Sequence, residues 1–170
     1  MAQKVPPVVA CRALIAGAFF LGAFSLAGTA TAAPKASGCF ARTYDAAHMR
    51  DNRSQHVQRL WLRLDHAESE PGKASFGMQV WVRGKPQIWR AGGQCERAGE
   101  SWICEPDTDG ASRLLLQLRE GKLHVANPGK LKIQDDRTGP DLNDMNVGGR
   151  ADAAFVLRPA RTSICKDASP

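Results

Sequence analysis

Ala91–Gln134 reads AGGQCERAGESWICEPDTDGASRLLLQLREGKLHVANPGKLKIQ, and this stretch decides the fold. Short runs that alternate apolar and polar residues are separated by turn-forming residues, a pattern typical of antiparallel strands joined by hairpins. Two cysteines lie near its start. The stretch therefore predicts a β-meander that carries a disulfide bond.

The leucine-rich run Arg113–Arg119 places its even-numbered leucines on one face. Glu120-Gly121 forms a two-residue turn, since glycine tolerates a positive φ. The turn around Pro128 leads into a third run, and directly opposed residues of an antiparallel pair share a face. The pattern predicts these core pairs along the three runs: Leu118 with Leu123, Leu116 with Val125, Val125 with Leu131, and Leu123 with Ile133.

Cysteine positions predict two disulfide bonds. A hairpin around Ala98-Gly99-Glu100 sets Cys95 opposite Cys104, within disulfide reach across two strands. Four cysteines remain after removal of an export signal, so that three connectivities are open, and elimination pairs Cys39 with Cys165. That long loop is expected to stabilise the fold by on the order of 4 kcal/mol. The alternative is a zinc site, which the spacing of the hairpin cysteines does not favour.

Residues 1–33 have the pattern of a signal peptide. Lys4 and Arg12 form a positive start, ALIAGAFFLGAFSL follows as an apolar run, and Ala30-Thr31-Ala32 fits the small-residue cleavage rule, with Ala33 as the alternative end. The apolar run is short for a membrane span, which needs about 20 residues. The sequence therefore predicts a periplasmic or secreted protein of one domain, residues 34–170, with no transmembrane segment. Lipidation of Cys39 is a second alternative, although Ala36 stands where a lipoprotein normally has leucine.

The charge of the chain is mildly basic. It has 23 Lys and Arg against 17 Asp and Glu, a net charge of +6, and the signal removes two basic residues and no acidic ones, which leaves +4. This density of positive charge is below that of a dedicated nucleic-acid binder, and no nucleic-acid partner is predicted.

A candidate binding surface follows from the two runs after a short predicted helix around Thr43–Arg50, for which Thr43 or Asp45 is the N-cap. In QHVQRLWLRLD and FGMQVWVR the apolar residues alternate with two tryptophans and three arginines. If the leucines and valines face the core, the other residues share the opposite face. We name them the Trp/Arg face: Arg59, Trp61, Arg63, Trp81 and Arg83. The alternatives are a cross-strand pair that only stabilises the sheet, and a face that other segments cover.

The segment Asp135–Arg150 is the only long run without alternation, and it is rich in Asp and Asn. Calcium prefers such oxygen ligands, but the spacing does not match a calcium-binding loop of the helix-loop-helix type. A solvated acidic loop is therefore expected here. A last strand follows through Ala153, Phe155 and Leu157.

Motifs for chemistry are absent from the sequence. There is no GxSxG, HExxH, CxxC or phosphate-binding glycine loop. The four histidines, at positions 48, 56, 66 and 124, belong to no recognisable ligand or base pattern. No catalytic residue, metal or cofactor is predicted, and the sequence leans against an enzyme.

The order of Cys39, Tyr44, His48, a Gly92-Gly93 pair with Cys95, then Cys104 and Cys165 resembles an uncharacterised group of secreted alphaproteobacterial proteins. That group brings no known activity. In size, cysteines and strand order, the chain is also similar to small periplasmic β-barrels that inhibit lysozyme, which is an analogy of fold.

Together these observations predict an all-β fold of eight or nine short antiparallel strands in a small barrel, with one N-terminal helix. A two-sheet sandwich is the alternative. The predicted function is an exported binding or inhibitor-type module that engages an envelope protein or glycan through the Trp/Arg face. The alternatives are a barrel that holds a small ligand among Phe76, Val80, Leu116 and Leu118, and a hydrolytic enzyme without a recognisable motif.

Overall fold

The computed structural model of the protein describes residues 37–127, 129–135, 144–148 and 150–168. The predicted signal peptide, residues 1–33, lies outside the described residues, as does most of the segment expected to be a loop between Asp135 and Arg150. In the described part of the chain, no helix has both the length and the apolar character needed to cross a membrane.

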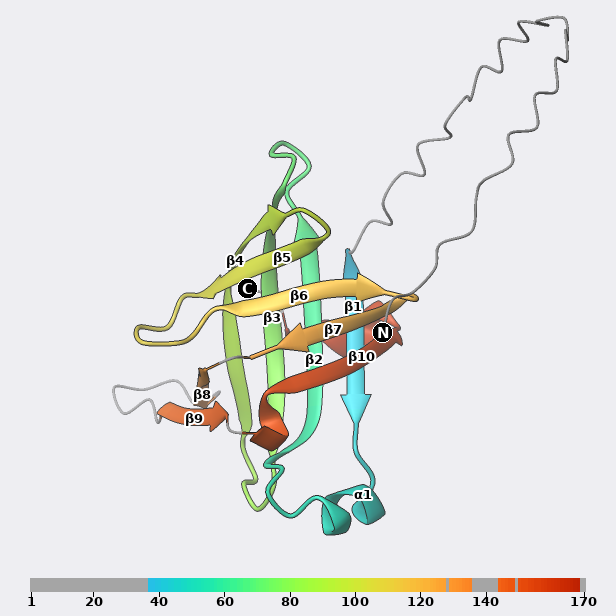
Figure 1. Ribbon diagram of the computed structural model, residues 1–170, viewed down its shortest axis with the longest axis vertical. Helices are drawn as coiled ribbons and strands as arrows, with labels where there is room; N and C mark the ends of the chain where they lie inside the picture. The colour runs from blue at the N-terminus through green and yellow to red at the C-terminus, as the bar shows by residue number, and fades with distance from the viewer. Residues whose placement is uncertain (1–36, 128, 136–143, 149, 169–170) are drawn as a thin grey trace, which may run out of the picture. The chain divides into compact units, whose positions relative to one another are not determined.

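Ten antiparallel strands and one α-helix form the described structure (Figure 1). Their bounds are β1 Gly38–Thr43, α1 Ala46–Asp51, β2 Val57–His66, β3 Lys73–Val82, β4 Ile88–Ala98, β5 Ser101–Pro106, β6 Leu114–Arg119, β7 Lys122–Ala126, β8 Lys130–Asp135, β9 Asp144–Gly148 and β10 Ala154–Ala160, with short 3-10 turns η1 Arg150–Asp152 and η2 Thr162–Cys165.

Eight of these strands close into a barrel. The order around it is β1-β2-β3-β4-β5-β6-β7-β10, and β10 returns to pair with β1. The predicted barrel is therefore confirmed, and the sandwich alternative is wrong. Closure pairs every barrel strand on both sides, so that the barrel has no open edge.

Side-chain alternation fills the barrel interior. Leu60, Leu62 and Leu64 of β2, the even-numbered residues of β3 and the leucines at positions 114 and 116 of β6 point inward and are almost completely buried. One contiguous hydrophobic cluster results. Its fully buried members include Leu60, Leu62, Leu64, Phe76, Val80, Leu114, Leu116, Leu123 and Leu157.

Both predicted hairpins in the central stretch are confirmed. Cys95 lies opposite Cys104, and β6 pairs with β7 so that Leu118 faces Leu123. Glu120 and Gly121 have φ values of 50° and 71°, as the twist of a tight two-residue hairpin turn requires.

The expected pairing of the third run was wrong. β8 does not pair with β7, because β10 occupies that edge with Phe155 opposite Val125. β8 pairs instead with the start of β4, where Trp89 faces Asp135, since β5 covers only the second half of that strand. Leu131 and Ile133 are buried as expected. Alternation therefore predicted correctly that these residues are buried, but not which strand β8 pairs with. Residues 144–148, expected to lie in a loop, form β9 against β8.

Two disulfide bonds are present, as predicted: Cys39–Cys165 and Cys95–Cys104. The first links residues 126 positions apart and joins β1 to η2. It also occupies the Cys39 sulfur that a lipoprotein would modify. Because Cys95 and Cys104 are bonded to each other, neither is a thiolate that could bind zinc. Two disulfides are compatible with an oxidising compartment.

The close packing of β4 explains one glycine of the Gly92-Gly93 pair. A Cβ on Gly93 would lie 2.0 Å from the main-chain oxygen of Glu105 and 2.8 Å from the Cα of Pro106. Only glycine allows the two strands to approach this closely at the point where β4 begins to pair with β5.

Candidate functional site

The two tryptophans of the Trp/Arg face lie together on the outer wall of the barrel. The register sets Trp61 opposite Gln79 and Arg59 opposite Trp81. The indole rings are 4.4 Å apart between centroids and tilted by 58°. Both rings are half-buried, which confirms that they face away from the leucine core.

Arg59 contacts both tryptophans of this pair. Its guanidinium carbon lies 5.8 Å from the ring centroid of Trp61 and 5.2 Å from that of Trp81. A cation at this distance from an aromatic face is attracted by the ring quadrupole. The arrangement holds one arginine over two adjacent rings, with part of all three side chains open to solvent.

The other two predicted arginines do not join Arg59 over the indole rings. The Nε of Arg63 forms an ion pair of 2.7 Å with Asp65, which lowers the net positive charge at that end of the face. Arg83 lies just beyond the end of β3, and its side chain turns toward α1 rather than toward the tryptophans. The prediction that Arg83 belongs to the Trp/Arg face was therefore wrong.

The C-terminal strap, residues 161–168, covers one side of the Trp/Arg face. Trp61 and Ile164 both pack against a second hydrophobic cluster, which consists of Ala168 and the two cysteines of the Cys39–Cys165 disulfide. Gln79, which alternation places on the outside, is only 2% exposed. The guanidinium of Arg90 donates a hydrogen bond to the main-chain oxygen of Asp167. Trp81 is not among the residues that pack against this cluster.

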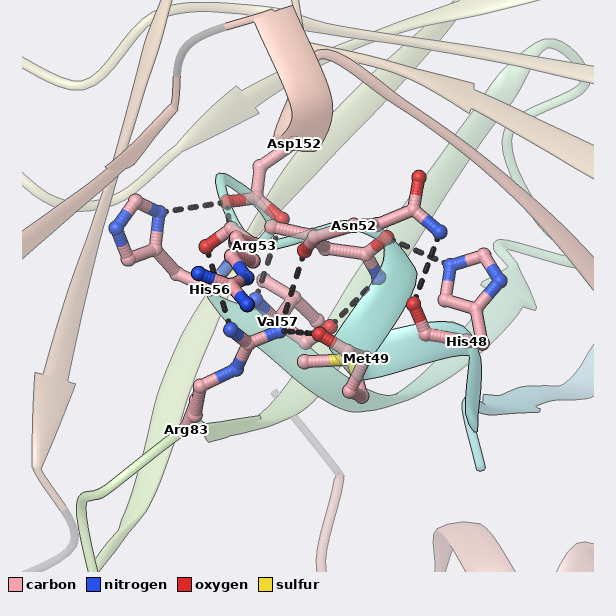
Figure 2. A network of polar contacts seen from close by, with 9 residues as sticks. His48, Met49, Asn52, Arg53, His56, Val57, Arg83 and Asp152 are labelled. Atoms are coloured by element: carbon pink, nitrogen blue, oxygen red, sulfur yellow. Dashed lines mark hydrogen bonds and ion pairs between the residues drawn. The ribbon is translucent and has the colours of Figure 1, made fainter. Parts of the chain in front are cut away.

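Helix α1 adjoins the opposite end of this face, and its ends are stabilised by side chains. Asp45 accepts a hydrogen bond of 2.7 Å from the main-chain N–H of His48, as an N-cap does. The guanidinium of Arg83 donates to three main-chain oxygens at the helix C-terminal end (Figure 2), those of Met49, Asn52 and Arg53.

A cavity of about 560 Å³ opens between α1 and the ends of β2 and β3. Gln58 in its wall precedes Arg59, and Arg83 follows Trp81 by two residues, so the cavity lies at the α1 end of the Trp/Arg face. Its wall combines an apolar part with three arginines and no acidic side chain; the lining residues are Ala46, Met49, Arg50, Arg53, Gln58 and Arg83.

A histidine–aspartate contact that the sequence did not indicate occurs at the start of β2 (Figure 2). Asp152 has no exposed surface, and one of its oxygens lies 3.1 Å from Nδ1 of His56. The same carboxylate accepts bonds from the main-chain N–H groups of His56 and Val57, at 2.9 and 3.2 Å. The two residues are 96 positions apart, and no local sequence signal links them.

This contact is the geometry that the hydrolytic alternative requires, but its other partners indicate a structural role. Asp152 joins η1 to the start of β2 through both of its oxygens. The His56 ring is 63% exposed, and within the described residues no Ser, Thr or Cys side chain is hydrogen-bonded to it. A nucleophile beside the base is the usual sign of covalent catalysis.

Tyr44 and His48 form a second polar group at this end of the barrel. Their rings stack with centroids 4.5 Å apart, and the guanidinium of Arg42 lies 4.9 Å from the Tyr44 ring. Burial raises the pKa of Tyr44, so the ring stays neutral at physiological pH. His48 Nε2 donates to Gln55 Oε1 at 2.9 Å, because the Gln55 amide nitrogen donates to Val57. These contacts hold α1 against the barrel.

Within the described ranges, no group of three or more His, Cys, Asp and Glu side chains is placed to hold a metal ion. Asp135, from the segment considered for calcium, is buried at the end of β8. The candidate site is thus a surface of tryptophan and arginine side chains with an adjoining cavity. Comparison with known protein families, with curated proteins and with solved structures finds no match to this chain, so that the candidate function rests on the geometry of this surface.

Proposed function

We propose that this protein is an exported binding or inhibitor-type module that engages a macromolecule of the cell envelope through the Trp/Arg face. The observation that carries the proposal is the position of Arg59 over two half-buried tryptophans on the outer wall. Tryptophan and arginine are the residue types most enriched where binding energy is concentrated.

An acidic glycan is the ligand class that this face fits best. The indole rings offer flat apolar surfaces for the C–H faces of sugar rings, and a guanidinium pairs with a carboxylate through two parallel hydrogen bonds. Arg59 has no ion-pair partner within the described structure, unlike Arg63. Export is supported by the signal-like sequence of residues 1–33 and by the two disulfide bonds.

The barrel interior does not favour the small-ligand alternative. Phe76, Val80 and Leu116 have no exposed surface, and they belong to one contiguous cluster of packed side chains. Interiors packed in this way leave few voids larger than a water molecule. The outer wall is therefore the better place to seek a ligand.

Replacing Trp81 by alanine together with Arg59 by glutamine is expected to weaken binding to cell-wall glycan at least tenfold. These side chains would supply contacts worth more than about 1.4 kcal/mol, which corresponds to that factor. Cosedimentation of the oxidised protein with purified peptidoglycan sacculi measures the effect. Trp61 is left intact because it packs against the C-terminal strap.

A matched control replaces two exposed side chains on the far part of the wall, Leu115→Ala with Arg119→Gln. This variant loses one apolar side chain and one positive charge, and it is expected to bind as the parent does. Equal loss in both variants, or no binding by the parent, would contradict the proposal for this ligand class. If the parent captures an envelope protein that the Trp81/Arg59 variant does not capture, the Trp/Arg face is still the binding surface, but its partner is a protein rather than a glycan.

A further inference from the structure

The cavity beside α1 has the features of a separate ligand site. Its volume of about 560 Å³ lies within the range of about 300 to 1,000 Å³ that small-molecule pockets occupy. Ala46 and the buried Met49 form its apolar wall. Arg50, Arg53 and Arg83 supply its charged groups.

Arg83 fixes one wall of this site, and it forms no ion pair with an acidic side chain of the described residues. Its guanidinium donates to the oxygens of Met49, Asn52 and Arg53 at 2.7, 3.2 and 3.2 Å. These carbonyls lie at the C-terminal end of α1, where the helix dipole is negative and an anion would be repelled. The fixed guanidinium offsets that negative end and also holds the cavity wall in place.

Arg50 and Arg53 remain available to a ligand. Both side chains are exposed, and neither forms an ion pair or a side-chain hydrogen bond with the described residues. They line the same cavity as Arg83, so that three like charges gather around an apolar wall that lacks an acid. An anion between Arg50 and Arg53 would relieve their mutual repulsion and form charge-assisted hydrogen bonds.

We propose that this cavity binds an organic anion with a short apolar body, such as an alkyl phosphate. The anionic group would lie between Arg50 and Arg53, and the apolar body would lie against Ala46 and Met49. This site does not rest on the proposed glycan-binding function, because neither Trp61 nor Trp81 lines the cavity.

Isothermal titration calorimetry of the oxidised protein with octyl phosphate tests the proposal, with inorganic phosphate and octyl glucoside as comparison ligands below their aggregation limits. We expect octyl phosphate to bind at least tenfold more tightly than either, because only it engages both the arginines and the apolar wall. The variant Arg50→Gln/Arg53→Gln is expected to weaken octyl phosphate binding at least tenfold, since it removes the charge-assisted hydrogen bonds to the phosphate group.

The matched control is Arg119→Gln/Arg158→Gln, which removes two exposed arginines from β6 and β10 and leaves the cavity unchanged. It is expected to bind octyl phosphate as the parent does. The proposal is overturned if the parent does not bind octyl phosphate, if octyl glucoside binds equally well, or if both double variants lose the same affinity. Circular dichroism establishes that each variant is folded, and Arg83 is left intact because it stabilises α1.

Discussion

Removing the Cys39–Cys165 disulfide, by replacing both cysteines with alanine, is expected to lower the free energy of unfolding by about 4 to 5 kcal/mol. The bond closes a loop between residues 126 positions apart, and the loss of loop-closure entropy from the unfolded chain grows with loop length. It also joins β1, one wall of the barrel, to the C-terminal strap. Urea denaturation followed by circular dichroism measures the change.

A second readout of the same variant is the exposure of Trp61. Trp61 packs against the cluster that contains the disulfide and Ala168 of the strap. Trp89 and Trp102 are 3% and 5% exposed inside the barrel, so iodide quenching of fluorescence reports mainly on Trp61 and Trp81. We expect quenching in the native state to increase when the strap is released.

The other disulfide provides the control for loop length. Cys95 and Cys104 are nine positions apart, and the loop-entropy relation gives a stabilisation about 2 kcal/mol smaller than for the long loop. If loss of this short bond destabilised the protein more than loss of Cys39–Cys165, the two ends of the domain would not be tied together in the way that the structure indicates.

Local patterns accounted for most of the barrel. The hairpins β4–β5 and β6–β7 join residues close in sequence, and their registers followed from turn chemistry and alternation. The Cys95–Cys104 bond followed from the first of these registers. Alternation also placed Trp61 and Trp81 on one face, because β2 and β3 pair directly. A side-chain period of two fixes the face of each residue once neighbouring strands are known.

Partners distant in sequence were not predictable in the same way. Alternation in β8 and in β10 fits the free edge of β7 equally well, and only closure of the barrel selects β10. Arg83 lies two residues after Trp81, so alternation assigns both to the same face. However, β3 ends at Val82, and alternation does not determine the side of a residue beyond the end of a strand. The strap and the Asp152 contact carry no periodic signal.

Replacing Asp152 by alanine is expected to lower the free energy of unfolding by about 3 kcal/mol. Its carboxylate has no exposed surface and accepts main-chain hydrogen bonds from His56 and Val57. Without it, two N–H donors at the start of β2 lose their acceptor, at about 1 to 3 kcal/mol for each donor left buried and unsatisfied. Thermal or urea denaturation measures the loss, and Asp152→Asn is expected to lose less because its amide oxygen still accepts one of these bonds.

The variant His56→Ala separates a structural carboxylate from a catalytic pair. The His56 ring is 63% exposed, and its loss removes one hydrogen bond, which contributes about 0.5 to 1.5 kcal/mol net, so this loss is expected to cost less than the loss of Asp152. The main-chain bonds from residues 56 and 57 remain in this variant, because they do not depend on the imidazole. Equal destabilisation by the two substitutions would show that the imidazole itself holds the carboxylate in place. Asp152 would then act through His56 rather than through the main chain, and the hydrolytic alternative would regain its best candidate for an oriented base.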